Sequence, residues 1–299
     1  MTTRAMTIER EQTRTVTAAR RLPGFADLLR LEYLKTSRRF MTRFIFGFLA
    51  AGVAGLFSLA YFVSFVLGVD DAPELSQFLM PATIEDGLSG IGFVGSVMMI
   101  VLAAGIAGSE YSWGTVRTVA ATGVERGRLL AAKLVILGVS SALLVATGLA
   151  AVAVTSTAIS LIEGQGLSLG WLNASMALEV LLMAARTTFV LAFYGVLGFA
   201  IAQVSRSLAA GIAIGIGLMV VEPILTMLIG ALGSFGEYAD DFSITINIEV
   251  ISSLNTFDTP REMIGAPEPW QSAALLTLYA IVAIGAAVIS FRRRDITTG

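Results

Sequence analysis

Long apolar runs separated by short charged segments dominate the sequence. Six runs hold no Lys, Arg, Asp or Glu except for Glu222 in the fifth: 44–69, 87–109, 134–162, 187–205, 207–236 and 270–291. Because a helix needs about 20 apolar residues to cross the hydrocarbon core of a bilayer, each run can form one span. The pattern predicts an all-α integral membrane protein with six transmembrane helices over residues 44–291. At the outer end of the fourth span, residues 171–185 could extend the helix or lie along the interface.

The segment 22–43 has the pattern of an amphipathic helix. At about 100° per residue, one face carries Leu22, Phe25, Leu29, Tyr33 and Phe40, and the opposite face carries Asp27, Arg30, Lys35 and Arg38. Such a helix lies in the headgroup layer before the first span, although Glu32 interrupts its apolar face. Leu31 and Leu34 fall on the charged face, where a docked protein would cover them. A surface anchor that only orients the first span is the alternative.

The distribution of charge orients the spans. All Lys and Arg residues except Arg186 and Arg261 fall on one side of the six-span arrangement. The opposite loops are acidic, with Asp70, Asp71, Glu74, Glu85 and Asp86 in one and Glu237, Asp240, Asp241, Glu249, Asp258, Glu262 and Glu268 in another. Because cytoplasmic loops carry the excess of Lys and Arg, the basic side and both termini are predicted to be cytosolic. We expect a mobile cytosolic tail at residues 1–21 and a second tail at 292–299.

The composition narrows the chemistry that the chain can perform. Apolar residues make up 56% of it and charged residues 14%, and it has no His and no Cys. These absences exclude a Ser-His-Asp triad, a disulfide framework and a His- or Cys-based metal site, so we expect neither catalytic residues nor a metal. The only lysines are Lys35 and Lys133, and neither follows Gly as a phosphate-binding loop requires. The sequence therefore has no phosphate-binding loop of this type.

The basic loop between the second and third spans contains a candidate short helix. Thr115 can cap a helix that Gly123 ends, which places about two turns across the membrane exit. Arg126, Arg128 and Lys133 follow at the mouth of the third span, where they suit anionic headgroups. A plain loop whose cations reach the headgroups is an equally good interpretation of the pattern alone.

These residues also carry a resemblance to a known family. The order Glu110, Gly114-Thr115, Arg117-Thr118, Gly123, Arg126, Arg128, Leu130 and Lys133 resembles the permease subunit of ABC-2 type transporters. The amphipathic segment, the six spans, the turn at Arg206-Ser207 and the basic C-terminus extend the similarity over most of the chain after Leu22.

The resemblance implies an exporter in which two six-span subunits, in the simplest case a homodimer, bind two ATPase subunits. It implies a coupling helix that contacts the ATPase. The residues assigned to this contact are Glu110, Trp113, Gly114, Thr115, Arg117 and Thr118, and Leu31 and Leu34 of the amphipathic helix form its other part. ATP and Mg would be bound by the partner, and this chain would hold no cofactor. The expected location is the cell (inner) membrane of a prokaryote, and no nucleic acid is expected as a partner.

Ionisable and small residues inside the spans leave alternatives open. Glu222 and Pro223 could form a polar point on the exit pathway for a cationic substrate. Alternatively, the helix breaks or kinks at Pro223 and Glu222 lies near a watery re-entrant segment, which we favour. The stripes Gly211/Gly215 and Gly47/Gly55 could form a dimer seam, although packing within the chain is the better expectation.

Other function classes have weaker support in the sequence. A secondary transporter, or another polytopic membrane protein without an ATPase partner, would predict inverted repeats or paired charges at mid-membrane, and neither is found. An intramembrane hydrolase lacks both His and Gly-x-Ser-x-Gly. A copper-linked permease of the same family is disfavoured because the chain has no His and no Cys.

The topology can be tested with a reporter that is active only outside the membrane. Fused after Gly299, it should give no signal, because an even number of spans returns the C-terminus to the basic, cytosolic side. A fusion in the acidic loop after Asp71 should give a signal and serves as the control. Activity of the fusion at Gly299 would contradict the six-span topology.

Overall fold

The computed structural model describes residues 24–66, 74–112, 126–166, 170–231, 241–258 and 265–292, without the side chains of 110–112, 126 and 292. These residues form helices and connecting turns, with no strand among them. The helices are α2 (Phe25–Ser37), α3 (Phe40–Tyr61), η1 (Phe62–Val66), η2 (Leu75–Phe78), α4 (Thr83–Ser112), α6 (Arg126–Ile162), α7 (Ala174–Ser205), α8 (Leu208–Gly230), α10 (Ile244–Ser253) and α11 (Pro269–Arg292).

The predicted six-span, all-α architecture is confirmed. Six helical segments are long and apolar enough to cross a membrane: Phe40–Phe65, Thr83–Ser109, Gly127–Ile162, Ala174–Ser205, Leu208–Gly230 and Pro269–Phe291. The predicted tail at 1–21 lies outside the described residues, as does the tail at 292–299 apart from the backbone of Arg292.

Several helices extend beyond the apolar runs that predict them. The helix α6 begins at Arg126, α4 begins at Thr83, and α7 begins at Ala174, so most of the open segment 171–185 extends the fourth span. Backbone hydrogen bonding in a helix does not depend on the polarity of the side chains, so a charged residue can limit an apolar run without ending the helix. Lys133 and Arg186 lie inside α6 and α7 and are bonded to other parts of the protein.

The expected break at Pro223 is wrong. The helix α8 continues through Pro223 to Gly230. Proline removes one backbone hydrogen bond, but the remaining bonds and neighbouring groups can keep such a helix continuous inside a membrane. Glu222 therefore lies within a helix and not in a re-entrant loop.

The described part of the amphipathic segment, residues 24–43, forms parts of two helices rather than one. The helix α2 ends at Ser37, and Arg39 has an extended backbone that turns the chain into α3. The residues of α2 that are buried against the protein are Leu28, Glu32 and Thr36, so Glu32 interrupts the apolar face at the point where that face meets another helix.

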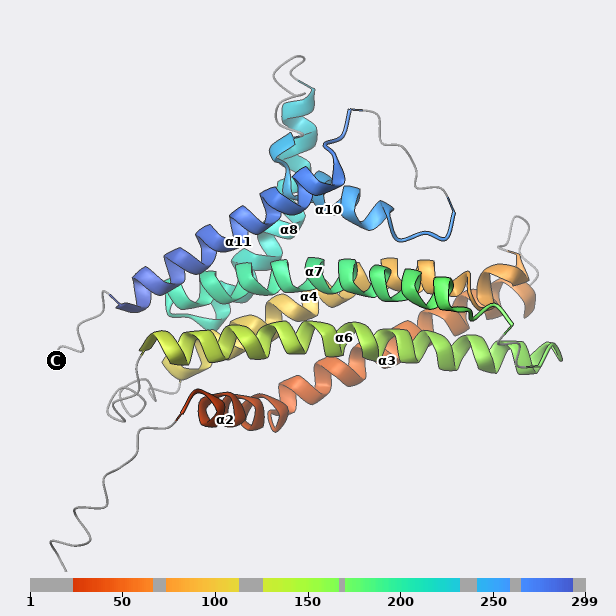
Figure 1. The fold of residues 1–299 in the computed structure, drawn as a ribbon, viewed down its shortest axis with the longest axis horizontal. Coiled ribbons are helices and arrows are strands. Elements are labelled where there is room, and N and C mark those ends of the chain that lie inside the picture. The colour runs from red at the N-terminus through yellow and green to blue at the C-terminus, as the bar shows by residue number, and fades with distance from the viewer. Residues whose placement is uncertain are drawn as a thin grey trace, which may run out of the picture.

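The helices α4 and α7 pack closely at the centre of the molecule. Figure 1 shows α4 running behind α7, with α6 and α3 below them. A Cβ on Gly198 of α7 would lie 2.9 Å from the carbonyl oxygen of Ile100 on α4, and one on Gly108 would lie 2.7 Å from the Cα of Leu208. The absence of a side chain at these glycines lets the backbones approach, as is common where helices associate in lipid.

The two small-residue stripes differ in their surroundings. Gly211 packs against Ala202 and Ala104, and Gly215 packs against Ile100, so this stripe serves packing within the chain, as expected. The expectation is wrong for Gly47 and Gly55, because no heavy atom lies within 4 Å of a Cβ built on either residue.

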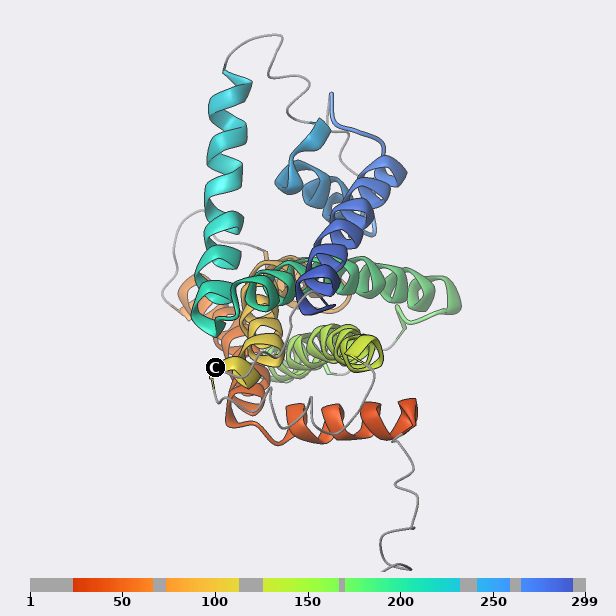
Figure 2. The ribbon, with the colours of Figure 1, turned by 90° about the vertical axis from the view of Figure 1, so that its left-hand side faces the viewer.

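The helix α8 diverges from the central pair towards its C-terminal end. Figure 2 shows α8 rising steeply away from α4 and α7, with α10 and α11 on the other side of the gap. The short helix α10 contacts α8, α7 and α11. This arrangement makes α10 the element that connects the diverging α8 to the rest of the bundle at its outer end.

We predict that Gly198→Ala destabilises the bundle, because the added methyl group meets backbone atoms that cannot rotate away. The expected loss is about 1–3 kcal/mol, which is typical of overpacking. Gly217→Ala is the matched control, since a Cβ there meets nothing within 4 Å. Thermal unfolding in detergent should show a lower Tm for Gly198→Ala only. Equal Tm values for both variants and the wild type would contradict the close-packing argument.

Candidate functional site

The basic end of the bundle contains a buried ion pair between α2 and α6. Lys133 Nζ lies 3.4 Å from Glu32 Oε2, and the two side chains are only 4% and 8% exposed. Lys133 also donates to the carbonyl oxygen of Ile106 on α4 at 3.1 Å, and Lys35 approaches Glu32 at 3.5 Å. A buried charge is costly unless it is paired and hydrogen-bonded, so these contacts fix α2 against both α4 and α6.

A second contact ties the junction of α2 and α3 to the end of α4. Arg39 donates from Nη1 to the carbonyl oxygen of Gly105 at 2.8 Å and from Nη2 to Ser109 Oγ at 3.0 Å. A cation near the C-terminal end of a helix interacts favourably with its dipole and its last carbonyl groups. The residues Glu32 and Arg39 therefore connect α2 with both helices that flank the loop 113–125.

Some of the predicted coupling residues belong to the part of the chain that the structure describes, and the others do not. Trp113, Gly114, Thr115, Arg117 and Thr118 lie outside the described residues, while Glu110 belongs to the last turn of α4 without a described side chain. Leu31 and Leu34 lie on α2 and are 58% and 37% exposed, as expected from the charged face on which they stand. Figure 1 shows α2 alongside the N-terminal end of α6, which begins where this loop ends.

Glu222, at the other end of the bundle, binds the N-terminus of α10. Its Oε1 accepts hydrogen bonds from the Ser243 hydroxyl and the Ile244 amide, both at 2.8 Å, and its Oε2 accepts from the amide of Thr245 at 3.2 Å and from the hydroxyl of the same residue. Thr226 adds a hydroxyl contact from the next turn of α8. A carboxylate at a helix N-terminus satisfies amides that have no acceptor in the helix. No pattern in the sequence predicts this capping role.

The opposite end of α10 is held by α7 and α4. Arg186 donates from Nη1 to the carbonyl oxygen of Leu254 at 2.7 Å, and Asn255 Nδ2 donates to Thr187 Oγ1 at 3.1 Å. The Phe257 amide donates to Glu85 Oε1 at 2.6 Å. Both termini of α10 thus meet side chains of the complementary charge, a carboxylate at the amide end and a guanidinium at the carbonyl end.

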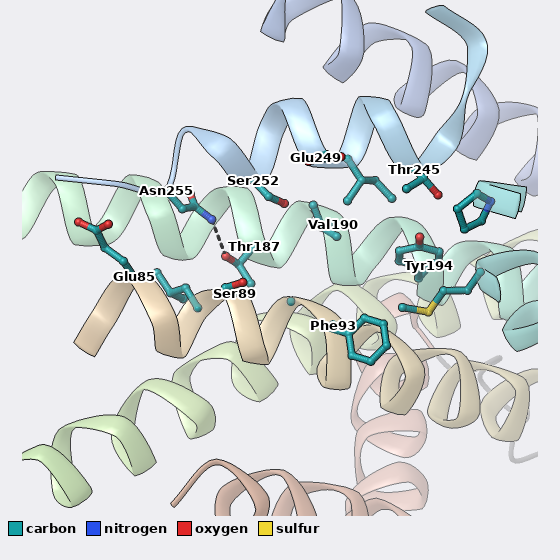
Figure 3. Close-up of a pocket in the computed structure, with 15 residues that line it drawn as sticks. Glu85, Ser89, Phe93, Thr187, Val190, Tyr194, Thr245, Glu249, Ser252 and Asn255 are labelled. Carbon is teal, nitrogen blue, oxygen red and sulfur yellow. Dashed lines mark hydrogen bonds between the residues drawn. The ribbon is translucent and has the colours of Figure 1, made fainter. Parts of the chain in front are cut away.

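A cavity of about 370 Å³ lies beneath α10, between α4, α7 and α8. Figure 3 shows Thr187, Val190 and Tyr194 of α7 along one side and residues of α10 facing them. Its lining includes Glu85, Glu249, Tyr194 and Pro223 but not Glu222, whose carboxylate is bonded to α10. The mixed polar and aromatic lining is typical of a small-molecule site. Among the described residues, no group of three His, Cys, Asp or Glu side chains could hold a metal.

The sequence contains weak signals for these polar contacts between helices. Glu32 interrupts an apolar face, Lys133 is one of two lysines, and Arg186 stands inside a span-length helix. Each is an isolated charge among apolar neighbours, which indicates that a partner is needed. The partner could not be named, because Glu32 and Lys133 are 101 positions apart.

We predict that Glu32→Ala and Lys133→Ala each lower the free energy of unfolding by about 3–5 kcal/mol, because each leaves the other charge buried without its partner. The double variant should cost less than the sum of the two. Glu179→Ala, at an exposed position of α7, is the control and should cost little. Denaturation in detergent micelles measures all four proteins. Strictly additive single effects would contradict the pairing.

Comparison with known proteins gives the family. The sequence profile described as ABC-2 family transporter protein matches residues 28–222, which is more than half of the chain. The match runs from α2 to the carboxylate that binds α10, and so includes both the Glu32–Lys133 pair and Arg39. No curated protein matches the sequence. The chain belongs to the ABC-2 family of transporter proteins, which are membrane permease components of ABC transporters.

Proposed function

We propose that the chain is the permease subunit of an ATP-driven exporter in the inner membrane of a prokaryote. Two copies form the translocation pathway as a homodimer, and each contacts one copy of a separate ATPase subunit that binds ATP and Mg. Permeases of this family generally work with ABC ATPase subunits.

The observation that carries the proposal is the connection of α2 to α4 and α6. Glu32 pairs with Lys133 of α6, and Arg39 binds the carbonyl end of α4. These helices are the two that flank the loop carrying Trp113 and Arg117. A protein docked on that loop and on the exposed Leu31 and Leu34 would therefore push on elements that are bonded to one another.

The bonded connection of α2 with α4 and α6 would transmit movement of the ATPase subunits to the permease. When nucleotide binding closes the ATPase subunits, they displace α2 and the loop together, because the buried pair resists separation. The helix α4 carries the displacement across the membrane to Glu85. The carboxylate of Glu85 accepts a hydrogen bond from the amide of Phe257, which follows α10 in the chain. The outer end of the permease would then open or close as α4 shifts.

The pathway residues are proposed at the outer cavity. Pro223 lines the cavity, while Glu222 contributes indirectly by holding α10 over it. A polar and aromatic cavity beneath a bonded helix supports a site where cargo pauses before release. Glu249 and Glu85 in the lining favour a cargo that carries positive charge.

We predict that Trp113→Ala and Arg117→Glu uncouple transport from ATP hydrolysis, because Trp and Arg are the residues that most often anchor interfaces. Loss of the Trp113 anchor should cost about 2 kcal/mol or more of docking free energy. Membrane insertion should be unchanged, since neither substitution lies in a span. Co-purification of the ATPase and transport in proteoliposomes measure the effect.

Trp270→Ala is the matched control, because Trp270 is an exposed Trp at the opposite end of the bundle. It should leave co-purification unchanged. Normal co-purification and transport in both loop variants would overturn the coupling role. Transport by the wild-type chain alone, driven by an ion gradient without the ATPase, would instead identify a secondary transporter.

A further inference from the structure

A second cavity, of about 220 Å³, lies at the basic end of the bundle between α2, α3 and α6. It is separate from the cavity beneath α10 and shares no lining residue with it. One end is polar and includes Tyr33, Thr42 and Arg43, while the other end is apolar and includes Phe46, Val139 and Leu143. A cavity with one polar and one apolar end has the chemistry of an amphiphile site.

Thr42 presents a buried hydroxyl group that needs a partner. The residue is only 7% exposed, and its Oγ1 makes no hydrogen bond within the described part of the chain. Buried polar atoms in native structures are almost always hydrogen-bonded, so an unpaired one at a cavity wall is available to bind an occupant of the cavity. A hydroxyl donor favours a ligand that carries an acceptor oxygen.

The N-terminus of α3 adds further donors at the same place. Arg39 is its N-cap residue, and its side chain, which is bonded to α4, does not cap the first amides of α3. Across the described ranges, the amides of Phe40, Met41 and Thr42 have no backbone acceptor. Such amides carry the positive end of the helix dipole and bind anionic oxygens readily.

Arg43 supplies a positive charge that no carboxylate of the described residues pairs with. Its Nε donates weakly to the Ser37 carbonyl oxygen at 3.4 Å, whereas Nη1 and Nη2 make no hydrogen bond or ion pair with the residues that the structure describes. The buried carboxylate of α2, Glu32, is already bound by Lys133 and Lys35. The polar end of the cavity therefore has an excess of positive charge.

The apolar end of the cavity opens towards the surrounding lipid. Val139 and Leu143 of α6 are 44% and 48% exposed on the outside of a transmembrane helix. One turn of α3 separates Arg43 from Phe46, about 5 Å along the helix axis. An occupant would thus lie with its anionic part at the headgroup layer and its hydrocarbon part along α6.

We propose that this cavity binds an anionic phospholipid of the cytoplasmic leaflet. The phosphate accepts hydrogen bonds from the Thr42 hydroxyl, the Arg43 guanidinium and the first amides of α3, and one acyl chain lies on Phe46, Val139 and Leu143. The bound lipid covers the junction of α2 and α3, next to Arg39 and its contacts with α4. It stabilises the position of α2 whether or not an ATPase binds there, so the proposal is independent of the proposed function.

The test compares lipid binding by the purified chain in detergent. Native mass spectrometry counts bound lipid after addition of dioleoylphosphatidylglycerol or dioleoylphosphatidylcholine at equal concentration, and unfolding temperature is measured with each lipid and with inorganic phosphate. The wild type should retain the anionic lipid preferentially and be stabilised by it. Thr42→Val and Arg43→Gln should each weaken retention about tenfold, as expected for loss of a hydrogen bond to a charged group.

Two controls isolate the site. Arg38→Gln removes an exposed cation of the same region that does not line the cavity and should leave retention unchanged. Val139→Trp blocks the apolar end from the lipid-facing side and should also abolish retention, so the test does not depend on variants of the buried end. Equal retention of the two lipids by the wild type, or unchanged preference in Arg43→Gln, would overturn the proposal. Stabilisation by inorganic phosphate equal to that by the anionic lipid would overturn the lipid assignment.

Discussion

The close approach of α4 to α7 and α8 is the constraint on which the remaining structure depends. Lipid chains are as apolar as the side chains of a span, so burial alone does not hold helices together in a bilayer. Dispersion contacts must replace it, and they require backbones to come near each other. Gly198, Gly108 and Gly215 permit this approach, because each faces Ile100 or Leu208 at a distance that excludes a side chain.

Close packing of backbones extends only part of the way along the bundle. At the ends of the bundle, polar contacts connect the helices instead. The helix α8 is packed on α4 near its N-terminus, at Gly211 and Gly215, and diverges further on (Figure 2). The gap is bridged by α10, whose termini are held by Glu222 and Arg186. A charge-assisted hydrogen bond to a helix end satisfies two groups that would otherwise be costly to bury.

The same principle operates at the basic end, with a different consequence. The pair Glu32–Lys133 and the contacts of Arg39 bind α2 and its junction with α3 to α4 and α6, two helices long enough to span the membrane. The helix α4 is contacted at both of its ends, by Arg39 at Gly105 and by the Phe257 amide at Glu85. A movement of α4 therefore alters the surroundings of both polar ends of the molecule.

The sequence is sufficient to predict the number of spans and the all-α class, because the length of an apolar run reports directly on its ability to cross a bilayer. It also places Leu31 and Leu34 on the exposed face of α2, since helical periodicity fixes faces locally. The roles of the isolated charges, in contrast, depend on the folded arrangement of the helices. The sequence predicts that Glu222 lies beside a broken helix, whereas in the structure it binds the N-terminus of α10. Glu32 interrupts the apolar face of its helix in the sequence, and the structure shows that it pairs with Lys133 of α6. These partners come from helices whose relative placement is set by packing between glycine-bearing backbones, and no periodic pattern within one segment encodes that placement.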